Sequence, residues 1–335
     1  MSKHYDSNRG PGHHCGDGTW RITRRDLLKA SGLALAGLSV AAPLVRAAEG
    51  GSKTALRFGM VTDPHYADID HRGKRYYRES VAKMAECVKL MNEKKVEFLI
   101  ELGDLKDQAS KPTAKSTLTY LRTIEQAFQK AKAPTYHALG NHDEDSISKD
   151  EFLAVVSNTG IPRTSKYYSF DLKGMHMVVL DANYLTDGTD YCRGNFNWTN
   201  ANVPPAELKW LDGDLTSTTK PVIVFLHQQL DGKGSHYVKN APEVRRILQK
   251  HKKVLAVFQG HNHAGHYSQI KGIHYYTLKA MIEGTGEKNN SYAIVEINDN
   301  RDITVTGYRK AIDKTLKRVS TRRSSSISTA RYPLR

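Results

Sequence analysis

Five short motifs rich in Asp, Asn and His each follow a run of apolar residues that is typical of a buried β-strand. The runs are Leu56–Val61, Phe98–Leu102, Pro134–Leu139, Pro221–Leu226 and Val254–Gln259. Predicted helices at 75–92 and 118–131 separate the first three strands, and this β-α-β-α-β series predicts a parallel sheet covered by helices. Because the carboxyl ends of parallel strands form one ligand-binding edge, we expect the five motifs to meet there.

The side chains of these motifs predict a metal site. The candidate ligands are Asp63, His65, Asp104, Asn141, His227, His261 and His263. One His after a strand is usually an ordinary loop residue, but five such loops at one edge argue against coincidence. A carboxylate can bridge two ions about 3.5–4 Å apart. Mixed His and carboxylate ligands suit Mn, Fe, Zn or Co better than Ca or Mg, so we expect two divalent transition-metal ions.

The rest of the chain predicts one folded domain over residues 56–310. Residues 167–172 and 175–181 flank Lys173-Gly174, which is typical of a β-hairpin. A long polar loop at 182–204, which contains Trp198, is of a length that is often functional. Helices are expected at 207–215 and 242–249, and strands at 273–278, 292–297 and 303–308. The basic, Ser-rich residues 314–335 predict a disordered tail.

Residues 1–47 predict a disordered start followed by an export signal. Thr23-Arg24-Arg25-Asp26-Leu27-Leu28-Lys29 resembles a twin-arginine signal, and an apolar stretch at 30–42 follows it. That stretch is shorter than the roughly 20 residues that span a bilayer, so no stable membrane span is expected. Cleavage is predicted after Ala47. We therefore expect the export machinery as a partner and a periplasmic or secreted location; the alternative is an uncleaved amphipathic helix.

Charge and cysteine content favour neither a nucleic-acid-binding protein nor a zinc knuckle. The net charge is +15, but the Lys and Arg residues are scattered and form no stripe with interleaved aromatics. Nucleic acid is therefore an unlikely partner. The three cysteines show no CxxC spacing. Cys87 is expected to be buried in a helix, and pairing between Cys87 and Cys192 stays open.

The motifs resemble those of the calcineurin-like metallophosphoesterases, whose pattern is DxH, GDxxD, GNH[DE], GHxx and GHxH. Here they are Asp63-Pro64-His65, Gly103 to Asp107, Gly140-Asn141-His142-Asp143, His227, and Gly260-His261-Asn262-His263. The resemblance implies a four-layer αββα sandwich with two mixed β-sheets. It implies that Asp63, His65 and His263 bind one ion. Asn141, His227 and His261 would bind the other, and Asp104 would bridge.

The resemblance also implies roles in catalysis. His142 would act as general acid, oriented by Asp143, while Asp107 is expected to hydrogen-bond the turn after Asp104. His227 departs from the pattern because Leu226 precedes it in place of Gly. His137 and His176 are alternatives to it, but both lie inside predicted strands.

A closer likeness is to the manganese-dependent ADP-ribose and CDP-alcohol diphosphatases of this superfamily, carried by residues 58–68, 75–78 and 265–268. It favours Mn, although that group typically has Gln in place of His65. The implied reaction is hydrolysis of a small phosphorylated substrate by a hydroxide between the two ions. A phosphomonoesterase and a phosphodiesterase or nucleotide diphosphatase both remain open. An exported nuclease is an alternative. A non-catalytic metal-binding module is disfavoured because every ligand of the family pattern is present.

Overall fold

The predicted β-α-β-α-β series forms the parallel half of one mixed sheet. The computed structural model describes residues 53–195 and 197–318. The strands of this sheet are β1 (Thr54–Val61), β2 (Leu99–Glu101), β3 (Thr135–His137), β10 (Ser291–Asn298), β11 (Ile303–Arg309) and β12 (Lys314–Leu316). β1, β2 and β3 run parallel, as predicted, and β10 pairs antiparallel with β1. The strand order is β12-β11-β10-β1-β2-β3.

The second sheet is also mixed. Its strands are β4 (Tyr168–Leu172), β5 (Met175–Val179), β6 (Val222–Phe225), β7 (Val254–Gln259), β8 (His266–Ile270) and β9 (Ile273–Thr277). The order is β4-β5-β6-β7-β9-β8, with antiparallel pairs at both edges and parallel pairs between them. Lys173 and Gly174 both have positive φ, as a tight β4–β5 turn requires, which confirms the predicted hairpin.

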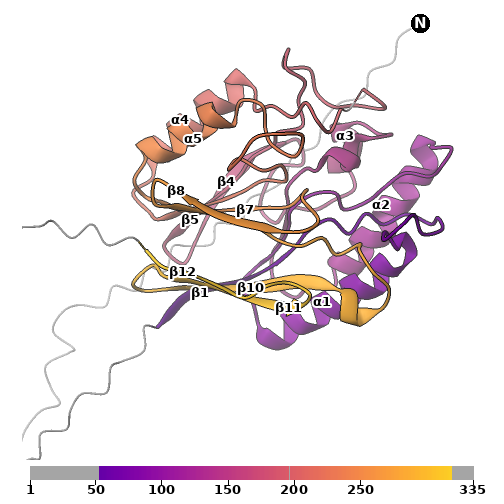
Figure 1. Cartoon of the computed structure of the whole chain (residues 1–335), viewed down its shortest axis with the longest axis horizontal. Coiled ribbons are helices and arrows are strands. Elements are labelled where there is room, and N and C mark those ends of the chain that lie inside the picture. Colours follow the sequence, from indigo (N-terminus) through magenta and orange to yellow (C-terminus); the bar gives the residue numbers. More distant parts are fainter. Residues whose placement is uncertain (1–52, 196, 319–335) are drawn as a thin grey trace, which may run out of the picture. The chain divides into compact units, whose positions relative to one another are not determined.

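Apolar contacts stack the sheets and helices into four layers (Figure 1). The helices are α1 (Ser80–Lys94), α2 (Ala114–Phe128), α3 (Lys149–Leu153), α4 (Pro205–Ser217) and α5 (Ala241–Lys250), with 3-10 turns at Tyr77–Glu79, Asn141–Glu144 and Glu287–Asn289. Between the sheets, the Phe58 ring stacks on Phe98 at 4.7 Å and meets Phe225 edge-on at 5.6 Å. One further apolar cluster joins α1 and α2 to the first sheet, and another joins α4 and α5 to the second. The expected αββα sandwich is thereby confirmed.

Two strands were missed, and one of them corrects the predicted domain end. β12 pairs with β11, and its Leu316 is fully buried between the sheets. The segment expected to be a tail from residue 314 therefore begins inside the sheet, because a single apolar residue anchors it. β8 was missed because its side chains are polar and partly exposed. The rest of the predicted tail, residues 319–335, lies outside the described residues.

Other sequence predictions concern the surface and the termini. The predicted export signal and its cleavage position lie outside the described residues. Among the residues that are described, no helix has the length and apolar character needed to cross a membrane.

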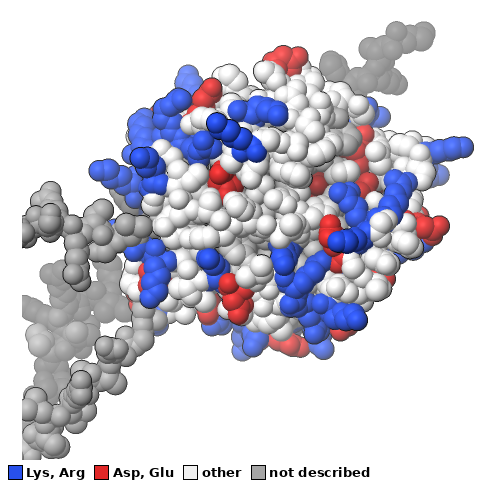
Figure 2. All heavy atoms as spheres, viewed as in Figure 1, with Lys and Arg blue, Asp and Glu red and all other residues white. Residues whose placement is uncertain are grey.

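Cys87 is buried, as expected, and both it and Cys192 are free thiols. On the face shown in Figure 2, Lys and Arg side chains are spread around the molecule and interspersed with Asp and Glu.

Candidate metal centre

All five motifs lie directly after the carboxyl ends of strands, three in the first sheet and two in the second. β1, β2 and β3 lead into the first three motifs, and β6 and β7 lead into the last two. The structure brings the candidate ligands together in one centre, and every one except His263 is buried. The shared sheet edge expected from the sequence is thus an edge where two sheets meet.

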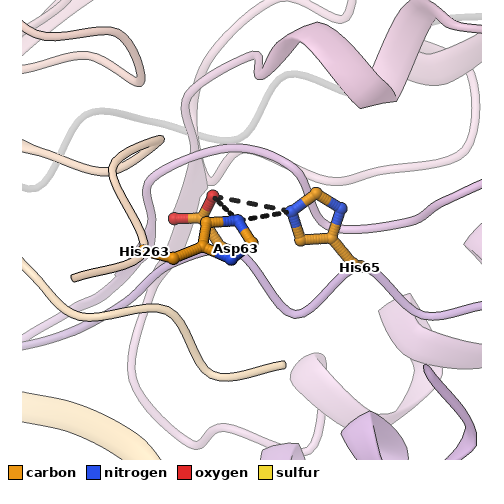
Figure 3. Close-up of side chains that lie close together, drawn as sticks. All are labelled: Asp63, His65 and His263. Carbon is orange, nitrogen blue, oxygen red and sulfur yellow. Dashed lines mark hydrogen bonds and ion pairs between the residues drawn. The ribbon is translucent and has the colours of Figure 1, made fainter. Parts of the chain in front are cut away.

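One group of donors consists of Asp63, His65 and His263 (Figure 3). Asp63 Oδ1 lies 3.4 Å from Nε2 of His263 and 3.6 Å from Nε2 of His65. The two Nε2 atoms are 3.2 Å apart. Asp63 Oδ2 accepts hydrogen bonds from the Thr62 hydroxyl at 2.7 Å and the His261 amide at 3.1 Å. These bonds fix the carboxylate so that Oδ1 faces the imidazoles.

The second group consists of Asp104, His227 and His261. Asp104 Oδ2 lies 3.0 Å from Nε2 of His227 and 3.4 Å from Nε2 of His65. It therefore lies between the two groups of donors. Asp104 Oδ1 accepts a hydrogen bond from the amide of His142 at 2.7 Å.

His227 is placed in the centre despite its departure from the sequence pattern. Its Nδ1 donates to the carbonyl of Leu102 at 2.8 Å, which leaves Nε2 free to face Asp104. This fixes the tautomer in the way that metal-binding histidines require. The two alternatives lie elsewhere: His137 is held between Glu101 and Glu125, and His176 between Asp171 and Asp214.

Several donor atoms are buried without a hydrogen-bond partner, which is the condition that bound cations would relieve. They are Asp63 Oδ1, Asn141 Oδ1 and His261 Nε2. Buried polar atoms are nearly always satisfied in folded proteins, so three such atoms in one centre need an explanation. Mixed imidazole nitrogens and carboxylate or amide oxygens match the donors of transition-metal ions. The residues present therefore fit divalent metal ions.

The backbone of the motifs is held in costly conformations. Asp63, His65, Asp104 and His261 all have φ between 47° and 66°. A non-glycine residue in this region costs about 1–3 kcal/mol and typically occurs where function requires it. Gly140 permits the loop after β3 to approach Asp104 closely, because a Cβ at Gly140 would lie 2.1 Å from the amide nitrogen of Asp104.

Asp143 holds the backbone around the candidate bridge Asp104. Its carboxylate accepts hydrogen bonds from the amides of Gly140 at 2.9 Å and of Asp104 and Leu105 at 3.0 Å each. These bonds tie the loop after β3 to the loop after β2. Asp143 thus positions the candidate bridge Asp104, and its predicted role in orienting the His142 ring stays a prediction.

The carboxylates beside the His142 ring are Asp107 and Asp145. Each has an oxygen 3.5 Å from Nδ1 of His142, and Asp145 also pairs with the buried Lys106 ammonium. Asp107 Oδ2 is also 3.3 Å from Nδ1 of His65. Asp107 Oδ1 also accepts a hydrogen bond from the amide of Gln108 at 2.7 Å. Asp107 therefore links the general-acid candidate to a ligand candidate.

The Asp and His side chains of the centre shift one another's pKa values. Burial would raise the pKa of Asp63, but His227 and His263 lower it well below its usual value. The pKa of Asp104 is also lowered, because His227 and His65 outweigh burial. Burial lowers the pKa of His227, but the carboxylates of Asp104 and Asp63 raise it by more, and its pKa is about 9. A nitrogen must lose its proton to bind a metal, so metal binding here is coupled to proton release.

The centre opens into a cavity of about 430 Å³. Its lining residues are Arg75, Asp104, Asn141, His142, Trp198, His236, His261 and His263. Sequence reasoning assigned no role to Arg75, Trp198 or His236. Trp198 could have been suspected because it lies in the long polar loop, whereas His236 carries no motif. Glu283 was missed too: its Oε1 lies 3.0 Å from Nδ1 of His263 and supports that ring.

Comparison with known proteins extends these observations. Residues 56–265 match the family model described as "Calcineurin-like phosphoesterase". The chain is 26% identical over 290 residues to the manganese-dependent ADP-ribose/CDP-alcohol diphosphatase of Arabidopsis thaliana, covering 73% of this chain and 91% of that protein. It is 28% identical over 272 residues to the protein of the same name from Oryza sativa, covering 68% and 83%. A dimetal phosphatase from Danio rerio shares the fold, with a TM-score of 0.68, 20% identity, and coverage of 80% and 100%.

Proposed function

Because the chain belongs to the calcineurin-like phosphoesterase family, and is therefore a hydrolase of phosphoester bonds, we propose that it is a diphosphatase acting on small nucleotide derivatives. The observation that carries the proposal is the convergence of the motif donors and His142 on one cavity. The plant relatives named as ADP-ribose/CDP-alcohol diphosphatases support this substrate class, since they align over more than two thirds of the chain.

The proposed centre holds two divalent ions. Asp63, His65 and His263 would hold one ion, and Asn141, His227 and His261 the other. Asp104 Oδ2, which faces both His65 and His227, would contact both ions. Manganese is favoured because the relatives are named as manganese-dependent. When bound, such ions offset phosphate charge and lower the pKa of water.

His142 is proposed to protonate the leaving group. It lines the cavity, and its side chain is 21% exposed, so a substrate can reach it. Burial would lower the pKa of His142, but Asp107 and Asp104 raise it well above its usual value. The carboxylates of Asp107 and Asp145 beside Nδ1 fix the ring.

Arg75 is proposed to bind phosphate oxygens. It lines the same cavity, and its Nη1 lies 3.8 Å from Asp107 Oδ2. A guanidinium presents several N–H donors in a plane that matches phosphate oxygens.

The proposal is tested by a substrate panel with added Mn²⁺: p-nitrophenyl phosphate, its bis-ester, ADP-ribose and single-stranded DNA. We expect the highest kcat/KM with ADP-ribose. A clear preference for the monoester would replace the diphosphatase with a phosphomonoesterase, and a preference for DNA would indicate a nuclease. Full activity after exhaustive chelation, with metal absent by elemental analysis, would contradict the metal-dependent reaction itself.

A further inference from the structure

One end of the cavity is walled by aromatic rings. The Trp198 ring centroid lies 5.4 Å from that of His236 and 5.9 Å from that of His261, and the two imidazoles are 5.3 Å apart. Trp198 is nevertheless 40% exposed. Among the described residues, Ile312 is the other large apolar side chain that is exposed. An exposed indole at the mouth of a polar catalytic cavity leaves an apolar ring face available to a ligand.

The loop that carries Trp198 is held in place by contacts that do not involve the indole. The hydroxyl of Tyr191 donates to the carbonyl of Asn197 at 2.6 Å, and the Asn197 side chain accepts from the amide and hydroxyl of Thr199. At the start of the loop, Lys149 forms an ion pair with Asp190 at 2.8 Å. The fold therefore positions Trp198 without needing its ring as a packing anchor.

The guanidinium of Arg75 also lines the cavity. Arg75 lies beside Asp107, and Asp107 is the carboxylate that also contacts His142. Asp107 also contacts His65 of the first donor group, whereas the aromatic wall contacts His261 of the second. Arg75 and the aromatic wall therefore lie beside different donor groups. A ligand that fills the cavity therefore needs a planar apolar ring at one end and anionic oxygens at the other.

We propose that Trp198 and His236 form a nucleobase subsite, in which the base of a nucleoside diphosphate stacks on the indole while Arg75 binds its phosphate oxygens. This inference rests on the proposed function and names the nucleobase as the part of the substrate that Trp198 and His236 recognise. Stacking on an aromatic face is tolerant of base identity, so adenine and cytosine should both be accepted. A single exposed ring fits one base, whereas single-stranded nucleic acid is bound by aromatics that stack successive bases.

The test compares a substrate that has a base with one that has none. Wild type, Trp198→Ala and Trp198→Phe are assayed with ADP-ribose and with glycerophosphocholine, since p-nitrophenyl esters would themselves stack. We expect Trp198→Ala to lower the ratio of the two kcat/KM values by about 5- to 100-fold, the range supported by stacking of one base. The effect should lie mainly in KM. Trp198→Phe should restore most of the ratio.

Ile312→Ala serves as the matched control, because it removes the other exposed apolar side chain, which is 54% exposed and does not line the cavity. It should leave the ratio unchanged. An unchanged ratio in Trp198→Ala, or an equal loss on both substrates, would overturn the nucleobase subsite while leaving the phosphoesterase standing. AMP titration supplies a second readout: quenching of tryptophan fluorescence in wild type should be lost in Trp198→Phe. Absence of metal-dependent hydrolysis of every substrate would instead contradict the proposed function.

Discussion

Replacing His142 by alanine is expected to preserve the metal donors and to slow turnover. The contact of His142 with the candidate bridge is made by its backbone, whose amide donates to Asp104 Oδ1 at 2.7 Å. Alanine keeps that amide. The His65 ring keeps its Asp107 partner at 3.3 Å, so the donor group beside it is retained. The substitution therefore removes a proton donor with little change to the centre.

The expected magnitude follows from the role of a general acid. Such a group contributes about 10²–10⁴-fold, or about 3–5 kcal/mol of transition-state stabilisation. The loss should be small for a leaving group that departs without protonation. We propose to measure kcat for a nucleoside 5′-(p-nitrophenyl phosphate) and for the corresponding methyl ester, which differ only in the leaving group. The His142→Ala loss should approach the full range on the methyl ester and be much smaller on the p-nitrophenyl ester.

Two controls make this result interpretable. Elemental analysis should show the same metal content in His142→Ala as in wild type. His266→Ala removes an imidazole that is 42% exposed and outside the cavity lining, and it should leave both rates unchanged. Equal losses on the two esters would refute the general-acid role and would indicate that His142 positions phosphate instead.

The remaining predictions concern the metals, the loop packing and export. Asp104→Asn should remove more activity than any other ligand substitution, because its oxygen faces both donor groups; two tightly held ions in that variant would show that Asp104 is not the bridge. Gly140→Ala should weaken metal affinity measured by chelator competition, because its Cβ would lie 2.1 Å from the Asp104 amide nitrogen, whereas Gly213→Ala meets nothing within 4 Å and should not. We also propose twin-arginine export: changing Arg24 and Arg25 to Lys should trap the folded enzyme inside the cell, and equal export by fractionation would defeat that route.

Much of the centre could be predicted because its donors are encoded locally. Each lies within a few residues of an apolar run, and the end of a parallel strand fixes where the next residue points. His227 illustrates this point: its flanking residues depart from the family pattern, yet its place after β6 was enough to identify it. The structure adds the reason, since the Leu102 carbonyl after β2 sets its tautomer.

The supporting residues could not be predicted because they act across long sequence separations. Asp143 lies in the short 3-10 turn at Asn141–Glu144, and its carboxylate accepts from amides that lie 38 and 39 residues earlier. Glu283 reaches His263 from a loop with no periodic pattern. Local sequence indicates which residues are donors, whereas packing between the two sheets decides which carboxylate supports which ring.

The strain in the motifs and the charge of the centre have a common explanation. Four donor residues adopt left-handed backbone conformations, and two buried carboxylates lie among four imidazoles. Neither feature stabilises the fold, because positive φ is unfavourable and buried charge is costly. Hydrogen bonds from the Asp104 amide to Asp143 and from the Thr62 hydroxyl to Asp63 hold the carboxylate loops, but they leave Asp63 Oδ1 and Asn141 Oδ1 without partners. Bound cations would satisfy those atoms and release the imidazole protons, so the free energy of metal binding would also stabilise the folded state. The strained backbone and the buried charges of the centre are thus the features that bound ions would compensate.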